Sequence, residues 1–272
     1  MVEIPFDRVE HLVRIPVRLP GGETARFLVD TGIGITVVSP TLVERCGLAA
    51  TGHSYTGHRM SGQAVQIPLV ELPHLDLGGR LLAAGTAGQA DLGPADGANG
   101  FDGILGLDLL GELPLTIDPF RSTVALGAVS GPTTRHRIEV PVRPHRDGPA
   151  VDLLVELQLP DGTVTEVEID TGSAETILDT RFMPACSVDG SETAARTVEG
   201  VDQTGHPFVR RFIPIDGAVA LAAAPGTALP RPTVMFQDLA LNGLIGTTFL
   251  DRYVQTYDTG RAILTLAPPQ GA

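Results

Sequence analysis

The chain has 272 residues, a net charge of −13 and 43% hydrophobic residues. Nucleic-acid binding depends on clustered positive charge, and the arginines of this acidic chain are dispersed, so we expect no nucleic-acid partner. The sequence contains no lysine, which excludes Schiff-base chemistry at a lysine and a Walker-type phosphate loop.

Short apolar runs punctuated by 32 Gly and 22 Pro predict an all-β fold, mainly strands with short helices. No apolar run approaches the roughly 20 residues that a membrane-spanning helix needs, and the first residues lack the basic and apolar segments of a signal peptide. We therefore expect no membrane association and a cytoplasmic location.

The first predicted elements in chain order are a hairpin turn and a strand. Leu19-Pro20-Gly21-Gly22 predicts the turn, and the strand that follows it ends in Phe27-Leu28-Val29, directly before Asp30. Ser39 is positioned to cap a short helix that ends near Gly47.

The same pattern recurs 140 residues later, where Asp30-Thr31-Gly32 is repeated as Asp170-Thr171-Gly172. Further pairs with this offset are Leu19–Gly22 with Leu159–Gly162, Thr36 with Thr176, Ser39 with Asp179, Cys46 with Cys186, Phe101–Gly106 with Leu241–Gly246, and Thr116–Leu126 with Thr256–Leu266. The sequence therefore indicates a tandem duplication, with lobes at residues 1–129 and 137–272 and a linker at 130–136. Because the two cysteines lie at equivalent positions of separate lobes, we expect no disulfide between them.

The two repeated aspartates are the candidate catalytic residues. If the lobes pack about a pseudo-twofold axis, Asp30 and Asp170 meet there, and two like charges so close together cannot both ionise easily. The pair then shares one proton. The ionised carboxylate activates a water molecule, and the protonated carboxyl donates to the carbonyl oxygen under attack.

The residues that follow each aspartate are suited to support this dyad. Gly32 and Gly172 allow the backbone to turn tightly beside the carboxylates. The hydroxyls of Thr31 and Thr171 are placed to hydrogen-bond across the axis and to lock the two loops together.

These motifs resemble those of the aspartic peptidases of the retroviral-protease and pepsin superfamily. That family combines an apolar run and Asp-Thr-Gly with a later element of two apolar residues and Gly, which this chain has at Ile104-Leu105-Gly106 and Leu244-Ile245-Gly246. The resemblance covers nearly the whole chain. It implies two pseudo-twofold-related, retropepsin-like lobes in which the later element passes behind the Asp loop. It also implies an aspartic endopeptidase with no metal or cofactor, acting as a monomer with an internal pseudo-dimer.

Within the superfamily, the retroviral type is the more similar, because both halves have a hairpin between the Asp loop and the later element. Gly57–Gly62 aligns with Gly200–Gly205, and by this resemblance the two hairpins are flaps over the substrate. Neither tip has the tyrosine found in the single flap of pepsin-like relatives. The expected substrate-binding residues of the flaps are Met60, Ser61 and Gly62 in the first half and Gln203, Thr204 and Gly205 in the second.

The two halves differ at the residue after Asp-Thr-Gly. In the family this residue is usually Ser, Thr or Ala, and Ser173 conforms as a further support of the dyad. The first half has Ile33, a branched apolar side chain that would desolvate Asp30, raise its pKa and favour it as the proton-bearing member. Ile33 would also narrow the cleft, so we count it among the substrate-binding residues.

Other polar residues fit structural roles better than catalytic ones. The histidines show no ligand spacing with a carboxylate or a cysteine, so we expect no metal site. Asp102 and Asp108 flank Gly106 but have no acidic counterpart in the other half, which favours turn or helix-cap roles.

Three functions remain open. The first is an aspartic endopeptidase that hydrolyses a specific peptide or protein held between the flaps and the dyad. The second uses the same dyad for a dehydration, isomerisation or cyclisation of a small molecule in a pocket lined by Ile33. The third is a binding module that keeps the duplicated fold without turnover, and the duplicated aspartates argue against it.

Overall fold

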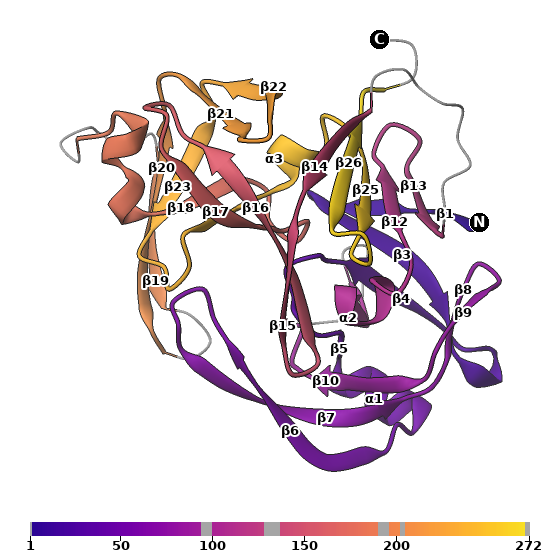
Figure 1. Cartoon of the computed structure of the whole chain (residues 1–272). Helices are drawn as coiled ribbons and strands as arrows, with labels where there is room; N and C mark the ends of the chain where they lie inside the picture. The colour runs from indigo at the N-terminus through magenta and orange to yellow at the C-terminus, as the bar shows by residue number, and fades with distance from the viewer. Residues whose placement is uncertain (1, 94–99, 128–136, 190–195, 202–204, 270–272) are drawn as a thin grey trace.

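The computed structural model describes residues 2–93, 100–127, 137–189, 196–201 and 205–269, and these residues form three β-sheets (Figure 1). The predicted all-β class is confirmed, because strands dominate and every helix is short. The predicted linker, residues 130–136, and the predicted end of the first lobe at residue 129 lie outside the described residues. No helix in the described ranges has the length and apolar character needed to cross a membrane.

Two of the sheets have ten strands each and the same order of strands. The first contains, in spatial order, β6 (Ala50–His58), β7 (Ala64–Leu72), β10 (Gly85–Gln89), β5 (Val37–Val38), β11 (Gly103–Leu105), β4 (Thr24–Val29), β3 (Leu12–Arg18), β8 (Leu75–Leu77) and β9 (Arg80–Leu82), with β2 (Asp7–Val9) paired to β3. The second contains β19 (Arg196–Val201), β20 (Pro207–Pro214), β23 (Thr233–Gln237), β18 (Thr176–Asp179), β24 (Gly243–Ile245), β17 (Val164–Ile169), β16 (Ala150–Gln158), β21 (Ala218–Leu221) and β22 (Ala224–Pro230), with β15 (Arg143–Asp147) paired to β16. Each strand of one sheet therefore has a counterpart in the other.

The third sheet joins the two halves. Its six strands are, in order, β1 (Val2–Pro5), β13 (Thr123–Leu126), β12 (Leu115–Asp118), β25 (Val254–Asp258), β26 (Ile263–Ala267) and β14 (Ile138–Pro141). The two halves meet where β12 pairs with β25. At this seam the hydroxyls of Thr116 and Thr256 lie 2.9 Å apart, so a pair of residues 140 positions apart sits on the pseudo-twofold axis.

The strand that leads into each Asp loop is held by the later element of its own half. β4 runs parallel to β11, and the backbone N–H of Asp30 donates to the Leu105 carbonyl at 3.0 Å. In the second half, β17 runs parallel to β24, and Asp170 donates in the same way to Ile245 at 3.0 Å. β11 and β24 also pair with β5 and β18, the strands that leave the Asp loops. Each later element thus lies between the two strands that flank its aspartate.

Helices are confined to short connections. α1 (Pro40–Cys46) begins after Ser39, whose hydroxyl accepts a hydrogen bond from the Leu42 N–H, and ends at Gly47 in the left-handed conformation with φ 62°. The other helical segments are η1 (Pro20–Gly22), α2 (Leu107–Leu110), η2 (Thr180–Phe182), η3 (Pro184–Cys186) and α3 (Thr247–Leu250). Cys46 is half-buried and Cys186 is buried, and both are free thiols.

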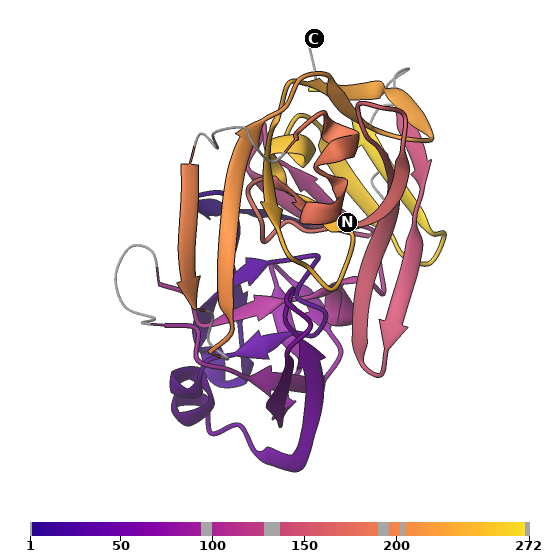
Figure 2. The ribbon, with the colours of Figure 1, turned by 90° about the vertical axis from the view of Figure 1, so that its left-hand side faces the viewer.

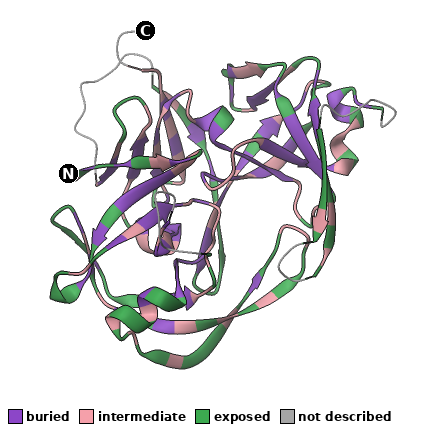
Figure 3. Cartoon of the chain, turned by 180° about the vertical axis from the view of Figure 1, so that it is seen from behind, coloured by how far each residue is buried: buried purple, intermediate pink, exposed green. Residues whose placement is uncertain are grey.

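The β6–β7 hairpin extends from the first half to the second half, where the β19–β20 hairpin runs down to meet it (Figures 1 and 2). The strands of both hairpins are mostly exposed or half-buried, in contrast to the buried strands of the centre (Figure 3). Polar contacts join the tip of the β6–β7 hairpin to the second half. The Ala240 N–H donates to the Met60 carbonyl at 2.8 Å, and Nε2 of Gln63 lies 3.4 Å from Nδ1 of His206.

Truncation of a core residue at the seam tests whether the halves unfold together. Leu115 in β12 is fully buried and lies opposite Tyr257 of β25. Leu115→Ala should lower the free energy of unfolding by about 2–4 kcal/mol in a single transition in urea, because the shared sheet couples both halves. The control Leu81→Ala removes a side chain that is 61% exposed and should cost less than about 0.5 kcal/mol. Two transitions, of which only one shifts, would show that the halves unfold independently.

Candidate active site

The two Asp-Thr-Gly loops are in contact at the centre of the molecule. A β-carbon added at Gly32 would lie 2.7 Å from Cγ of Asp170, and one added at Gly172 would lie 2.2 Å from an oxygen of Asp30. Non-bonded atoms do not approach so closely, so only glycine fits at either position. With no side chain between them, the carboxyl groups of the two aspartates lie close enough for the charge of one to act on the other.

The two threonines cross between the halves. The Thr31 N–H donates to Oγ1 of Thr171, and the Thr171 N–H donates to Oγ1 of Thr31, both at 3.1 Å. Each hydroxyl then donates to the strand of the other half, Thr31 to the Ile169 carbonyl at 2.7 Å and Thr171 to the Val29 carbonyl at 3.2 Å. Both threonines are buried. These four hydrogen bonds fix the separation of the two loops.

Hydrogen bonds within each loop orient the carboxyl groups. The Gly32 N–H donates to Oδ1 of Asp30 at 2.8 Å, and the Gly172 N–H donates to Oδ1 of Asp170 at 2.7 Å. The Ser173 hydroxyl donates in addition to Oδ2 of Asp170 at 2.6 Å. Ile33 stands at the equivalent place beside Asp30 and has no hydroxyl to donate, so the two aspartates have different surroundings.

The electrostatics of the dyad follow from this difference. Burial raises the pKa of Asp30 well above its usual value, and the charge of Asp170 acts in the same direction, while the Gly32 amide opposes them. A carboxyl that is buried beside another carboxyl favours its neutral form. The Ser173 hydroxyl donates to Asp170 alone, so the geometry favours Asp30 as the member that holds the proton.

Asp102 and Asp108 make structural contacts, but these contacts reach segments distant in the chain, and no side chain caps α2, so the expected cap role of Asp108 is not observed. Asp108 accepts hydrogen bonds from the backbone and the hydroxyl of Thr36, at 2.9 and 2.8 Å, and thereby braces the strand that leaves the first Asp loop. Asp102 accepts from the Arg26 N–H at 2.8 Å and pairs with Arg45 at 3.0 Å. Neither residue contacts the dyad in these interactions.

A cavity of about 720 Å³ lies beside the first Asp loop. The loop contributes Gly32 and Ile33 to its wall, and the β6–β7 hairpin and the β15–β16 hairpin of the second half line further sides of it. The backbone N–H of Val151 donates to the Gly34 carbonyl at 3.0 Å and joins this hairpin to the loop. The apolar wall includes Ile35, Tyr55 and Ile67, and the acidic residues in the lining are Asp91, Asp147, Asp152 and Glu168.

The predicted flap residues take different positions. Met60 packs against a small apolar cluster of the second half, and Gly62 lies in the turn with its α-carbon facing Ala240. Ser61 lies in the same turn, and Gly205 is exposed at the start of β20. Gln203 and Thr204 lie outside the described residues. Of the predicted substrate-binding residues within the described ranges, Ile33 is the one that lines the cavity, and a substrate contact by the flaps stays a prediction.

Three residues near the dyad were not expected from the sequence patterns. Glu168 lies two residues before Asp170 and lines the cavity, and Asp152 lies in the cavity wall 3.7 Å from His145. His11 donates from Nε2 to the Gly172 carbonyl at 3.0 Å. A signal for Glu168 exists in the sequence, because a charge interrupts the apolar run before Asp170 where the first half has Leu28. His11 and Asp152 have no comparable signal.

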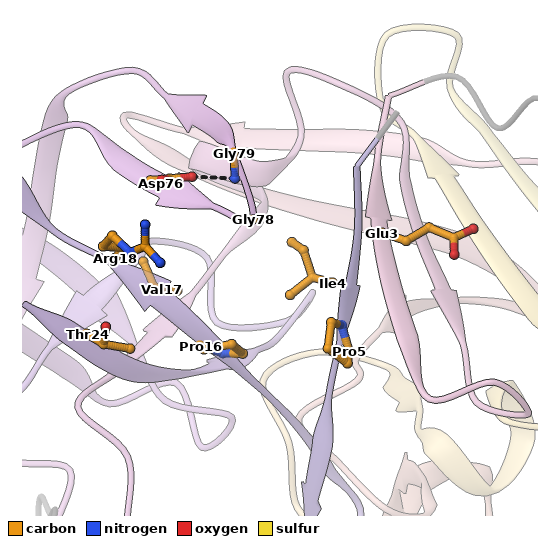
Figure 4. Close-up of a pocket in the computed structure, with 10 residues that line it drawn as sticks. All are labelled: Glu3, Ile4, Pro5, Pro16, Val17, Arg18, Thr24, Asp76, Gly78 and Gly79. Carbon is orange, nitrogen blue, oxygen red and sulfur yellow. Dashed lines mark hydrogen bonds between the residues drawn. The ribbon is translucent and has the colours of Figure 1, made fainter. Parts of the chain in front are cut away.

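Within the described ranges, no group of three or more His, Cys, Asp or Glu side chains is arranged to hold a metal ion. Another cavity, of about 280 Å³, is lined by residues of β1, β3 and the β8–β9 turn and by Thr24 (Figure 4). None of its lining residues belongs to an Asp loop.

Comparison with known protein families finds a match for most of the first half. Residues 15–109 match the model of the family described as aspartyl protease. The match runs from β3 through the Asp30 loop and the β6–β7 hairpin to α2, and it supports aspartic peptidase activity in general. No curated protein matches the chain. The relation of the second half to the aspartyl protease segment rests on the shared order of strands and the repeated motifs.

The half-buried Glu168 gives a pH-dependent stability that can be measured. Burial raises the pKa of Glu168 from 4.5 to about 9, with further contributions from Asp152, Asp170 and Asp30. Between these pH values the folded protein holds a proton that the unfolded chain has lost, so the free energy of unfolding falls as the pH rises.

In Glu168→Gln the side chain cannot titrate, so the folded and unfolded states no longer differ in the protons bound at this position. Between pH 5 and pH 8 the variant should lose about 1–3 kcal/mol less stability than the wild type, as measured by urea unfolding at each pH. Glu156→Gln, at an exposed position on β16, should follow the wild-type profile. Parallel profiles for the wild type and Glu168→Gln would contradict a raised pKa.

Proposed function

We propose that this protein is an aspartic endopeptidase that hydrolyses a specific peptide or protein through a water molecule activated between Asp30 and Asp170. The observation that carries the proposal is the close approach of each aspartate to the glycine of the other Asp loop, where no other residue has room. The aspartyl protease match over residues 15–109 supports the same reaction class. Because one chain supplies both carboxyls, we propose that the protein acts as a monomer, and a cytoplasmic location is part of the same proposal.

The two aspartates take different roles in the reaction. Asp170 acts as the base, since it accepts hydrogen bonds from Gly172 and Ser173 and takes a proton from the water. Asp30, whose pKa is raised, donates its proton to the oxygen of the scissile carbonyl as the water oxygen attacks the carbon. The tetrahedral intermediate then loses its amine, which takes up a proton from the dyad, and the carboxylic acid product leaves.

A second candidate keeps the dyad but acts on a small molecule. The observation that favours it is the cavity itself, since about 720 Å³ falls in the range of small-molecule sites and Ile33 contributes to its apolar wall. In this alternative the acid and base of the dyad catalyse a dehydration, isomerisation or cyclisation without hydrolysis.

Replacement of either aspartate tests the shared mechanism. Asp30→Asn and Asp170→Asn should each reduce kcat by a factor of roughly 10³ or more, because an amide cannot exchange the proton. Stability should change little or rise, since the amide has the same shape and relieves the repulsion between the carboxylates. The matched control, Asp216→Asn at an exposed position, should keep full activity. The mechanism is wrong if either dyad variant retains more than a small fraction of wild-type turnover.

Replacement of Ile33 separates the two candidate functions. Ile33→Ser introduces the hydroxyl that the second half has in Ser173, so it should favour ionisation of Asp30 and shift the upper limb of the pH–rate profile toward acid. Ile33→Ala enlarges the cavity without adding a donor and should shift the profile less. For a peptidase, both variants should cleave a broader range of a peptide library than the wild type. Cleavage by none of the three proteins would favour the small-molecule candidate.

A further inference from the structure

The cavity beside the dyad contains a carboxyl group whose partner is missing. Glu168 stands on β17, where its cross-strand neighbours are Leu154 and Leu244. The equivalent residue of the first half, Leu28, is buried and apolar. Within the described part of the chain, the Glu168 side chain makes no hydrogen bond or ion pair, although it is half-buried and lines the cavity.

The charges that surround this carboxyl are mostly of the same sign. Asp91, Asp147 and Asp152 line the cavity together with Glu168, while Arg59 is the arginine in the lining. The other titratable groups of the lining are His58 and His145, and His145 is already engaged with Asp152 at 3.7 Å. The lining therefore carries an excess of negative charge.

We propose that this cavity binds a cationic side chain of the peptide substrate, an arginine or a lysine, with Glu168 and Asp152 as its charge partners. The inference rests on the proposed peptidase function and names the substrate class of the same site. Because Gly32 and Ile33 belong both to the Asp loop and to the cavity wall, the cationic residue lies next to the bond that the dyad cleaves.

The shape of the cavity suits a long side chain with a charged end. Ile35, Ile67 and the ring of Tyr55 form the apolar wall, against which the methylene groups of an arginine or a lysine pack. The aromatic ring also offers a favourable face to a cation. Asp147, Asp152 and Glu168 lie on the part of the wall that comes from the second half, so the stem and the charge of the ligand meet different surfaces.

The energetics favour a ligand that brings positive charge. Ionising a carboxyl group that has no partner and is partly withdrawn from solvent costs free energy, so the neutral form is favoured. The pKa of Glu168, raised to about 9, reflects this cost of ionisation. A guanidinium or ammonium group placed beside Glu168 would supply the missing partner and form charge-assisted hydrogen bonds. A neutral side chain of the same size would leave the carboxyl group unpaired.

The first experiment measures cleavage. Wild-type protein is incubated with a randomised peptide library, and the products are sequenced by mass spectrometry. Arginine or lysine should be enriched at one fixed position beside the cleaved bond. The best arginine peptide is then remade with citrulline, which has the same shape but no charge, and kcat/KM should fall roughly tenfold or more.

Variants of the cavity provide the controls. Glu168→Gln should reduce the preference for arginine over citrulline to less than roughly threefold, and Asp152→Asn should reduce it in part. The conservative Glu168→Gln replaces a carboxyl that is neutral in the empty cavity, so the fold should persist. Glu156→Gln, which lies outside the cavity, should keep the wild-type preference.

The second experiment measures binding without cleavage. Asp30→Asn protein is titrated with acetyl-arginine amide or acetyl-citrulline amide, while the NMR signals of the Tyr55 ring, assigned with Tyr55→Phe, are followed. The proposal predicts saturable shifts of the Tyr55 signals with the arginine compound and none with the citrulline compound. These shifts should disappear in the double variant Asp30→Asn/Glu168→Gln.

The two experiments separate the two proposals. Cleavage with no preference for a basic residue would leave the peptidase function intact and overturn the cationic subsite. Failure to cleave any peptide, together with selective binding of the arginine compound, would support the subsite and count against the peptidase function. Equal binding of the arginine and citrulline compounds would overturn the subsite whatever the library shows.

Discussion

The reciprocal contact of Thr31 and Thr171 is the interaction on which the rest of the site depends. Each threonine accepts a backbone hydrogen bond from the other and donates to a strand of the opposite half, so neither Asp loop is positioned by its own half alone. This cross-connection brings each aspartate against the glycine of the other loop. The six-stranded sheet, with Thr116 and Thr256 on its central pair of strands, joins the two halves about the same pseudo-twofold axis.

The two halves share this symmetric backbone arrangement, but residue differences at three pairs of equivalent positions make them chemically different. Ile33 replaces a hydroxyl donor beside Asp30, and Glu168 replaces an apolar residue behind Asp170. Asp108 braces the first loop through Thr36, whereas in the second half the equivalent helix start donates backbone hydrogen bonds, Thr247 to the Ser173 carbonyl at 2.9 Å. A homodimer of one lobe would have two equal halves. A single chain permits each aspartate to have its own surroundings, and acid–base catalysis benefits from a pair whose members differ.

Much of this arrangement was predictable because it depends on local motifs that occur twice. The turn before β4, the cap Ser39 and the glycine at position 47 each carry their own sequence signature, and the 140-residue repeat relates the halves without any tertiary information. The contacts of His11 and Asp152 were not predictable, because they arise where the first hairpin of one half reaches the Asp loop of the other. The spacing of motifs in the sequence does not indicate which hairpin of one half contacts which Asp loop of the other half. Glu168 was overlooked for a different reason, since a single charged residue in a strand usually faces solvent.

The position of Glu168 links substrate binding to the protonation of the dyad. Burial and neighbouring carboxyl groups disfavour ionisation of both Asp30 and Glu168, so the site limits its negative charge by holding protons. A cationic side chain would reverse this tendency at Glu168, because it stabilises the ionised carboxylate there. The ion pair that forms has no net charge, so the dyad can keep the charge state suited to catalysis, one proton shared by two aspartates, with a substrate of the correct charge in place. Selectivity and proton balance would therefore share one physical origin, the excess of negative charge in this half of the site.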